Sequence, residues 1–529
     1  MALDSARSGP AQSGASTGTS TPPQLKKGAL GLVGVVFMVV AFSAPVTAMT
    51  GNLPVAVGFG NGIGAPAGFI IATIVLTIFS VGFIALARHI TAAGAFYTFV
   101  SRGWSRIVGL PAGVLSMFTY MTMEAALIGI FSAFAQQAVE SQFGLDLPWI
   151  VYGAACLVVI AVLSHKDISL AAKVLGLVLV LEIALLTATA VSSLVNAPEG
   201  LSLTSLNPAT ALSTNGVPGG VVGLGLLMAF WSWVGFESTA IYGEESKDPK
   251  RIVPQATLIA VIGIGVFYTF ISWGVIAGNG GAKSVELASG AEPFDLIYAP
   301  SEMYLGAWSV HAYQWLAIGG SFACALAIHN SAARYLFAFG RDRILPNKLG
   351  AVHETHNSPW IASLTQSCFA GILLLGCVIS GSDPYGVMFV LIGIMATLSL
   401  LAVQVMCSIS TIVYFHVRGE HPETKHWLRT LVCPVIGALG MLFVIYLMAS
   451  NMRAAAGAAS ETLLFKAIPY ILIVLFVASL VTALYLRRSH PAVYQRIGST
   501  IFDDLPAMDS HVLDDDPDPD HRTGTLGKP

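Results

Sequence analysis

The stretch GLVGVVFMVVAFSAPVTAMTGNLPVAVGFG, residues 31–60, begins as an apolar helix and is then interrupted. Pro45 has no N–H group and its ring clashes with the preceding turn, so a continuous helix is not expected there. A second proline, a glycine and several hydroxyl side chains follow within SAPVTAMTGNLP. Broken backbone at membrane depth is tolerated only where protein or a water-lined cavity surrounds it. The stretch therefore predicts a first membrane span that breaks halfway across.

The composition of the whole chain agrees with a membrane location. Of its 529 residues, 55% are hydrophobic and 10% are charged, whereas soluble proteins carry about a quarter charged residues. The six cysteines all fall in apolar runs without CxxC spacing, which predicts buried free thiols rather than a disulfide framework or a zinc site. We expect no cofactor, no metal and no nucleic-acid partner.

Runs of about 20 apolar residues, the length that one membrane-spanning helix requires, occur twelve times along the chain. We expect an all-α integral membrane protein with a transporter domain over 28–488, a disordered tail over 1–27 and an acidic tail over 489–529. The expected spans are 29–58, 65–88, 107–137, 148–164, 168–195, 218–243, 252–278, 308–338, 359–380, 385–415, 430–450 and 462–486.

The distribution of basic residues predicts the orientation. If the N-terminus is inside, only Lys283, Arg453 and Lys466 of the 26 Lys and Arg residues lie in outer segments. Cytoplasmic loops of membrane proteins carry the excess of Lys and Arg. We therefore expect both termini in the cytoplasm and the protein in the plasma membrane, in contact with lipid.

Three acidic residues fall inside expected spans: Glu124, Glu182 and Glu237. None has a basic partner nearby in the sequence. Burial in an apolar medium penalises a charged carboxylate, so each is a candidate proton carrier. The alternative is a structural acid held by hydrogen bonds.

The sixth expected span is also irregular, because GVVGLGLLMAFWSWVGFESTAIYGEES combines glycines, a serine, an acid and four aromatic residues near its middle. Irregular spans at corresponding positions of two halves are typical of inverted-repeat transporters. In such proteins half-helix ends meet at the midplane, where N-termini face anions and free carbonyls face cations.

Three ordered motifs resemble the amino acid–polyamine–organocation superfamily of permeases over residues 28–488. They are RHITAAGAFYTFVSRGWSRIVGLPAG (88–113), FWSWVGFESTAIYGEESKDPKRIVPQA (230–256) and NSAARYLFAFGRDRILPNKLGAVHETHNSP (330–359). The resemblance implies two inverted five-helix repeats followed by helices 11 and 12. It also implies a zwitterionic substrate between the breaks in helices 1 and 6.

The resemblance assigns roles to individual residues. Trp231 matches an aromatic residue that covers the substrate on its outer side, and Glu237 matches an acid linked to gating or protonation. Glu182 falls where some members place a lysine that substitutes for a sodium ion, so an acid replaces it here. We expect Glu182, Glu237 and Trp231 to act in proton coupling or gating.

The helix 1 break differs from the Gly-Ser-Gly of many amino acid permeases and is closer to the Thr-Pro-Met-Thr of putrescine-type permeases. Backbone amides of residues 46–48 suit an anion, whereas the hydroxyls of Ser43 or Thr47 suit an amine. Acids and aromatic rings, including Phe42, suit an ammonium group through charge and cation–π attraction. The candidate substrate-binding residues are Ser43, Ala44, Pro45, Val46, Thr47, Tyr120, Glu124, Phe230, Trp231, Trp233, Val234, Gly235, His329 and Asn330.

These features predict a secondary active transporter that imports an amino acid or a small organic amine, coupled to protons. An obligate amino acid or amine exchanger is the alternative within this class. A non-transporting membrane sensor and an intramembrane enzyme are the alternatives outside it, and we expect no enzymatic activity. The sequence leaves the cargo and the oligomeric state open.

Overall fold

The computed structural model describes residues 31–90, 94–165, 169–241, 246–353, 358–451 and 463–498. The expected N-terminal tail and residues 499–529 of the expected C-terminal tail lie outside the described residues. Ten helices of the described part are long and apolar enough to cross a membrane. Two shorter apolar helices, Trp149–Ser164 and Val222–Trp231, correspond to expected spans four and six. The prediction of an all-α membrane protein is confirmed.

The helices that make up the spans follow the chain in order. They are α1 (Leu32–Ser43), α4 (Ala65–Ala87), α6 (Arg106–Phe143), α7 (Trp149–His165), α8 (Ser169–Val195), α10 (Val222–Trp231), α12 (Pro249–Asn279), α15 (Ala307–Arg341), α16 (Trp360–Ile379), α17 (Ile392–Ile412), α18 (Cys433–Ser450) and α20 (Leu463–Ser489). Shorter helices are α2 (Pro45–Thr47), α3 (Leu53–Val55), α5 (Ala95–Gly103), α9 (Pro208–Ala211), α11 (Ser238–Ile241), α13 (Gly281–Ser289), α14 (Asp295–Leu305) and α21 (Pro491–Arg496). Wider π-helical turns cover Ala48–Asn52, Ala56–Gly60, Pro384–Leu391, Val413–Val417 and Leu428–Val432.

The break in the first span occurs at Ala44, which adopts left-handed backbone angles of φ 37° and ψ 79°. Proline disfavours the right-handed helical conformation for the residue before it, and Pro45 follows directly. The chain continues through α2 and the π-helical turn Ala48–Asn52. The predicted interruption of helix 1 is therefore present.

The sixth span breaks between α10, which ends at Trp231, and α11, which begins at Ser238. Gly235 has φ 108°, and a Cβ atom at this position would lie 2.8 Å from Cβ of Phe42. Only glycine meets both conditions without strain. The two interruptions therefore lie directly against each other. The first span makes the contact through Phe42 and the sixth span makes it through Gly235.

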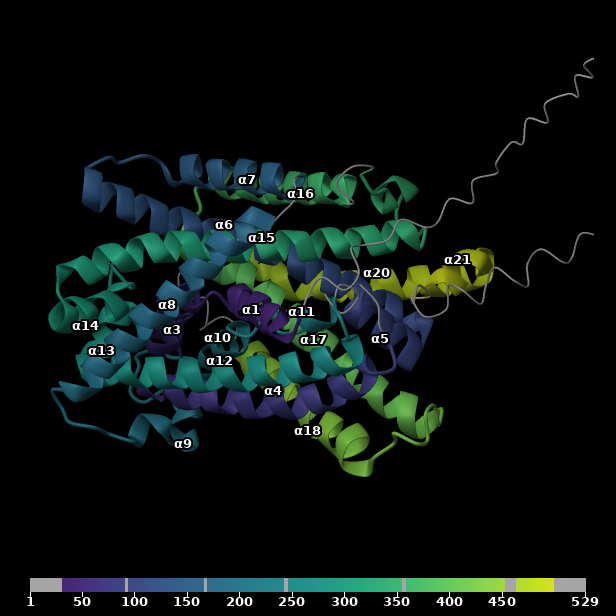
Figure 1. Cartoon of the computed structure of the whole chain (residues 1–529), viewed down its shortest axis with the longest axis horizontal. Coiled ribbons are helices and arrows are strands. Elements are labelled where there is room, and N and C mark those ends of the chain that lie inside the picture. Colours follow the sequence, from purple (N-terminus) through teal and green to yellow (C-terminus); the bar gives the residue numbers. More distant parts are fainter. Residues whose placement is uncertain are drawn as a thin grey trace, which may run out of the picture.

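Figure 1 shows the long helices running side by side, with α1 in the interior and α6 next to α15. The short helices α13 and α14 lie at one end of the bundle, and α5 and α21 lie at the other. The 38 residues of α6 extend about 57 Å at 1.5 Å per residue, so α6 is longer than a membrane core of about 30 Å is thick.

The outer helices present apolar side chains to their surroundings. Only 17% of the apolar window of α20 is buried inside the protein, and Tyr470, Val474 and Val477 are exposed on it. Extended exposed apolar surfaces of this kind are not found on soluble proteins. The chain is a multi-pass membrane protein.

One prediction about the cysteines is wrong. Cys156, Cys324, Cys377 and Cys407 are buried as expected and Cys433 is partly buried, but Cys368 is exposed. It lies on α16 on the same face as Leu364, Ile372 and Leu375, which are exposed too. In a membrane protein, an apolar run faces lipid as readily as it faces the interior, so an apolar neighbourhood does not imply burial.

Candidate functional site

A cavity with about 360 Å³ of empty space lies between the two breaks. The cavity is lined by residues of the two breaks, in the first and sixth spans, by residues of α6 and α15, and by Phe389. Its lining residues are Phe42, Ser43, Ala44, Thr47, Ala48, Asn52, Met123, Leu127, Trp231, Ser232, Val234, Cys324, Ile328 and Phe389.

Side chains from three other helices satisfy the backbone groups that the helix 1 break releases. Glu182 Oε2 of α8 accepts from the N–H of Val46 at 3.1 Å. The Tyr268 hydroxyl of α12 donates to the Ser43 carbonyl at 2.8 Å, and Cys324 Sγ of α15 donates to the Phe42 carbonyl at 2.7 Å. Buried backbone groups need such partners, so the sequence around the break is stable only in this tertiary setting.

Glu182 lies behind the break rather than in the cavity wall. Its side chain is 2% exposed. A Cβ atom built on Gly320 of α15 would lie 2.2 Å from Glu182 Oε1, so the absence of a side chain at Gly320 provides the room that the carboxyl group occupies. From α8, this acid therefore contacts both the break in the first span and α15.

Glu237 spans the helix 6 break. It accepts from the Tyr120 hydroxyl of α6 at 2.6 Å and from the N–H of Gly235 at 3.2 Å. The Tyr120 ring stacks on Tyr335 of α15, with centroids 5.4 Å apart. Glu237 thus connects the break in the sixth span to α6. It is fully buried.

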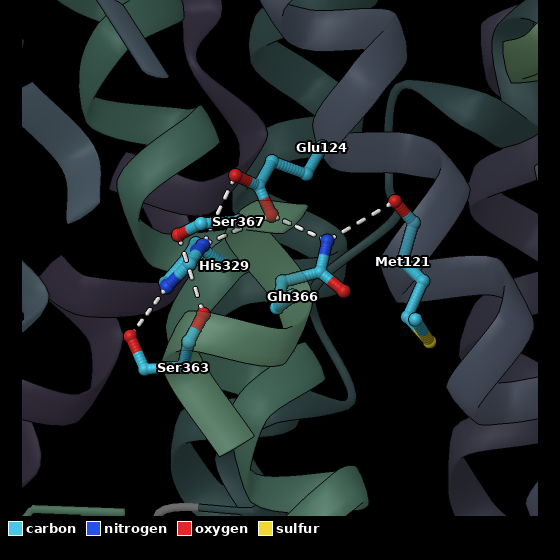
Figure 2. A network of polar contacts seen from close by, with 6 residues as sticks. All are labelled: Met121, Glu124, His329, Ser363, Gln366 and Ser367. Atoms are coloured by element: carbon cyan, nitrogen blue, oxygen red, sulfur yellow. Dashed lines mark hydrogen bonds and ion pairs between the residues drawn. The ribbon is translucent and has the colours of Figure 1, made fainter. Parts of the chain in front are cut away.

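Glu124 is paired with a histidine from a distant helix, as Figure 2 shows. His329 Nδ1 lies 3.0 Å from both carboxylate oxygens of Glu124, and His329 Nε2 lies 2.8 Å from Ser363 Oγ. Gln366 of α16 donates to Glu124 Oε2 at 2.5 Å and to the Met121 carbonyl at 3.2 Å. Glu124 and His329 are both fully buried, so each serves as a hydrogen-bond partner for the other.

Two of the aromatic side chains of span six point in different directions. Trp231 lines the cavity and packs on Phe389, with ring centroids 4.5 Å apart. Trp233 instead donates from Nε1 to the Val261 carbonyl at 3.0 Å and packs against Phe69 and Tyr268. An aromatic cluster at helical spacing therefore divides between the cavity and the helix–helix interior.

The candidate binding residues fall into two groups. Ser43, Ala44, Thr47, Trp231 and Val234 line the cavity, together with Phe42. The others lie in or next to the breaks or behind the wall, outside the lining: Pro45, Val46, Tyr120, Glu124, Phe230, Trp233, Gly235, His329 and Asn330.

Sequence reasoning considered Ala48 only for its backbone amide, and it missed Asn52, Met123, Leu127, Ser232, Cys324, Ile328 and Phe389. Asn52 belongs to the same interrupted stretch as Pro45, and Ser232 lies between two residues that were selected, so both carried a usable signal. Met123 and Ile328 directly precede Glu124 and His329 in the chain, but their apolar side chains resemble every lipid-facing residue of the protein.

Comparison with known proteins gives one family for most of the chain. Residues 30–477 match the family described as "Amino acid permease". The low-affinity putrescine importer PlaP of Escherichia coli (strain K12) is 22% identical over 423 residues, which cover 78% of this chain and 88% of that protein. The branched-chain amino acid permease BcaP of Bacillus subtilis (strain 168) is 22% identical over 403 residues, covering 73% and 80%. The methylthioribose transporter of the same organism is 25% identical over 240 residues, covering 44% and 47%.

Proposed function

Because the chain belongs to the amino acid permease family, we propose that it is a secondary active transporter that imports an amino acid or a small organic amine across the plasma membrane. The observation that carries this proposal is the cavity formed where interrupted helices 1 and 6 meet. Broken helices that meet near the midplane are the usual binding architecture of secondary transporters. The region 28–488 is the transporter domain in this proposal.

Alternating access follows from the contact between the two breaks. Phe42 and Gly235 approach so closely that the broken segments move as one unit. The surrounding wall, formed by α6 and α15, stays fixed in this mechanism. Rocking of the unit against the wall opens the cavity first to one side and then to the other. The inverted repeat of two five-helix halves supplies the symmetry for the two states.

Proton coupling is assigned to Glu182, with Glu237 as the second candidate. An ionised Glu182 forms a charge-assisted hydrogen bond with the Val46 N–H, and such bonds are about twice as strong as neutral ones. Protonation weakens this bond and so releases the helix 1 break from α8. Uptake by Glu182→Gln in proteoliposomes is expected to lose its dependence on an inward proton gradient; full retention of that dependence rules out this assignment.

Transport itself is tested by uptake of labelled amino acids and amines into proteoliposomes. Trp231→Ala and Glu237→Gln are expected to abolish the specific flux because one removes a cavity wall and the other alters the helix 6 turn. Trp308→Ala is the matched control, since Trp308 is 62% exposed on α15. A membrane sensor or an intramembrane enzyme would show no specific flux in the wild type.

Obligate exchange is the alternative within transport. It is separated from symport by comparing uptake into empty vesicles with uptake into vesicles loaded with unlabelled substrate. A symporter fills empty vesicles when a proton gradient is applied, whereas an exchanger requires substrate inside.

We place both termini in the cytoplasm. Arg102 Nε donates to the Gly498 carbonyl at 2.9 Å, and Arg418 donates to the Arg102 carbonyl at 2.7 Å. Three segments expected to be cytoplasmic therefore meet at one end of the bundle, in agreement with the excess of basic residues there. Labelling of single cysteines introduced at Gly144 and at Glu420 from outside intact cells tests this, because only position 144 is expected to react.

A further inference from the structure

The cavity between the breaks carries no ionisable carboxyl, amine, guanidinium or imidazole group among the residues that line it in the described part of the chain. We propose, on the basis of the transport function above, that the substrate is a neutral amino acid with an apolar side chain and that diamines are excluded. The inference depends on three features of the site: where the acids lie, which polar atoms face the cavity and which apolar residues line it.

Each of the three acids predicted inside the spans, Glu124, Glu182 and Glu237, is engaged outside the cavity. Figure 2 shows the Glu124 carboxylate directed at His329 and Gln366, although Met123, the preceding residue, lines the cavity. Glu182 is bonded to the Val46 N–H and Glu237 to the Tyr120 hydroxyl. A second ammonium group of a diamine therefore has no counter-ion at the cavity surface.

Two polar atoms in the cavity wall lack partners within the protein. Thr47 Oγ1 and Asn52 Oδ1 are buried and have no hydrogen-bond partner among the described residues, and both residues line the cavity. The Asn52 amide nitrogen donates to Ser232 Oγ at 3.0 Å, which orients Oδ1 as a free acceptor. Asn52 Oδ1 suits the ammonium group of a zwitterion, and the Thr47 hydroxyl can donate to its carboxylate.

A zwitterion suits such neutral groups because its two charges compensate each other. A diamine carries two positive charges, and an isolated ammonium group in an apolar environment is unstable without a paired charge. The broken helix 1 therefore discriminates by net charge, even though its Ser-Ala-Pro-Val-Thr sequence also resembles that of amine permeases.

The part of the cavity wall that α6 and α15 supply through Met123, Leu127 and Ile328 is apolar. Met123 and Leu127 lie one turn apart on α6, and Ile328 of α15 lies beside them in the lining. An apolar substrate side chain gains binding free energy in proportion to the area that it buries against such a surface. These apolar residues, together with the unpartnered Thr47 Oγ1 and Asn52 Oδ1, suit a single amino acid with a branched aliphatic or an aromatic side chain.

Competition against labelled leucine uptake in proteoliposomes tests the substrate class. Unlabelled isoleucine and phenylalanine are expected to compete, whereas putrescine and lysine in 100-fold excess are expected to leave the uptake unchanged. Competition by putrescine comparable to that by isoleucine overturns the inference. If putrescine is transported and leucine is not, the substrate class is wrong and transport stands; if nothing in a panel of amino acids and amines is transported, the proposed function itself is wrong.

A pair of variants tests the assignment of the apolar wall. Leu127→Asp places a carboxylate in the cavity. It is expected to weaken competition by unlabelled leucine about ten-fold, which corresponds to about 1.4 kcal/mol. It is also expected to let lysine or putrescine compete with labelled leucine. Leu127→Asn has the same shape without the charge and is expected to weaken leucine without admitting cations. Identical behaviour of the two variants contradicts the assignment. The wild-type competition decides the substrate class even if a variant fails to fold.

Discussion

Glu182 Oε2 accepts the backbone N–H of Val46 at 3.1 Å, although 136 residues separate the two in the chain. The bond connects a carboxyl group of α8 to the first free amide after the helix 1 break. A change in the charge of Glu182 is therefore transmitted directly to the backbone that forms the cavity, without an intermediate side chain.

The position of Glu182 depends on Gly320. In Gly320→Ala the new methyl group would lie 2.2 Å from Glu182 Oε1, so the carboxyl group must shift away from Val46. We expect uptake to lose most of its dependence on a proton gradient while the protein still folds. Gly263→Ala, also within a helix but with nothing within 4 Å of the new atom, is the control and is expected to behave as the wild type. Unchanged proton dependence in Gly320→Ala contradicts this role of Gly320.

The Glu124–His329 pair is expected to stabilise the protein only as a pair. His329→Gln removes the imidazole partner of the buried Glu124 carboxyl group, and a buried polar group that loses its hydrogen-bond partner typically costs about 1–3 kcal/mol. The double variant Glu124→Gln/His329→Gln removes both groups and is expected to recover at least half of the loss. Thermal unfolding of the wild type, both single variants and the double variant measures the coupling. Additive losses would show that the two side chains do not interact.

Trp231 requires a glycine on the facing helix. A Cβ atom at Gly393 of α17 would lie 1.9 Å from Trp231 Cη2, so Gly393→Ala must displace the indole from its place against Phe389. We expect the uptake rate to fall about ten-fold or more because the cavity loses one wall. Gly376→Ala, whose methyl group meets nothing within 4 Å, should leave uptake unchanged. An equal effect of the two variants would argue against displacement of Trp231.

Gly498, two residues after α21, is hydrogen-bonded to the end of the bundle and so holds the segment 491–498 there. Its N–H donates to the Tyr97 hydroxyl at 2.9 Å and to Asp342 Oδ2 at 3.1 Å. Gly498 has φ 62°, and an added Cβ would lie 2.5 Å from Cβ of Ser101. Gly498→Ala is therefore expected to release the segment and to speed its cleavage by added protease at least several-fold.

The control for this variant is Gly144→Ala. Gly144 has a similar φ of 67° but nothing within 4 Å of the added atom, so it tests backbone strain alone, typically about 1–3 kcal/mol. If cleavage after α21 is equally slow in both variants, Gly498 does not hold the segment.

His89 makes the stability depend on pH. Burial first, and then the adjacent His421, lowers the pKa of His89 below its ordinary value of 6.5; Lys250 and Arg88 act in the same direction and Glu423 opposes them. Below pH 6.5 the unfolded chain binds a proton that the folded protein does not, so the free energy of unfolding falls as the pH falls. We expect a lower melting temperature at pH 5.5 than at pH 7.5 and a smaller difference in His89→Gln. His311→Gln, at an exposed position, is the control; an unchanged slope in His89→Gln contradicts the assignment.

The membrane spans and their two interruptions were predictable from the sequence. An apolar run of about 20 residues has one stable solution in a bilayer, a helix with all its backbone groups paired. Pro45 removes a backbone N–H and clashes with the preceding turn, and here the helix ends just before it. These are local properties, and the observed helix bounds agree with the expected spans to within a few residues for most of them. The exposed Cys368 shows the limit of local reasoning, since which face of α16 meets lipid depends on its neighbours.

The sequence by itself determined that this chain crosses the membrane many times and breaks its first and sixth spans, because apolar length and proline act locally. Only the tertiary structure decided which groups meet: Glu124 and His329 are 205 residues apart and Tyr120 and Glu237 are 117 apart. It alone also selected Met123, Leu127 and Ile328 for the cavity wall, since apolar side chains pack equally well against lipid, other helices or a substrate. Among the residues that the structure describes, the cavity lining carries no acidic side chain because packing directs Glu124, Glu182 and Glu237 elsewhere, a property that no single segment of the sequence contains.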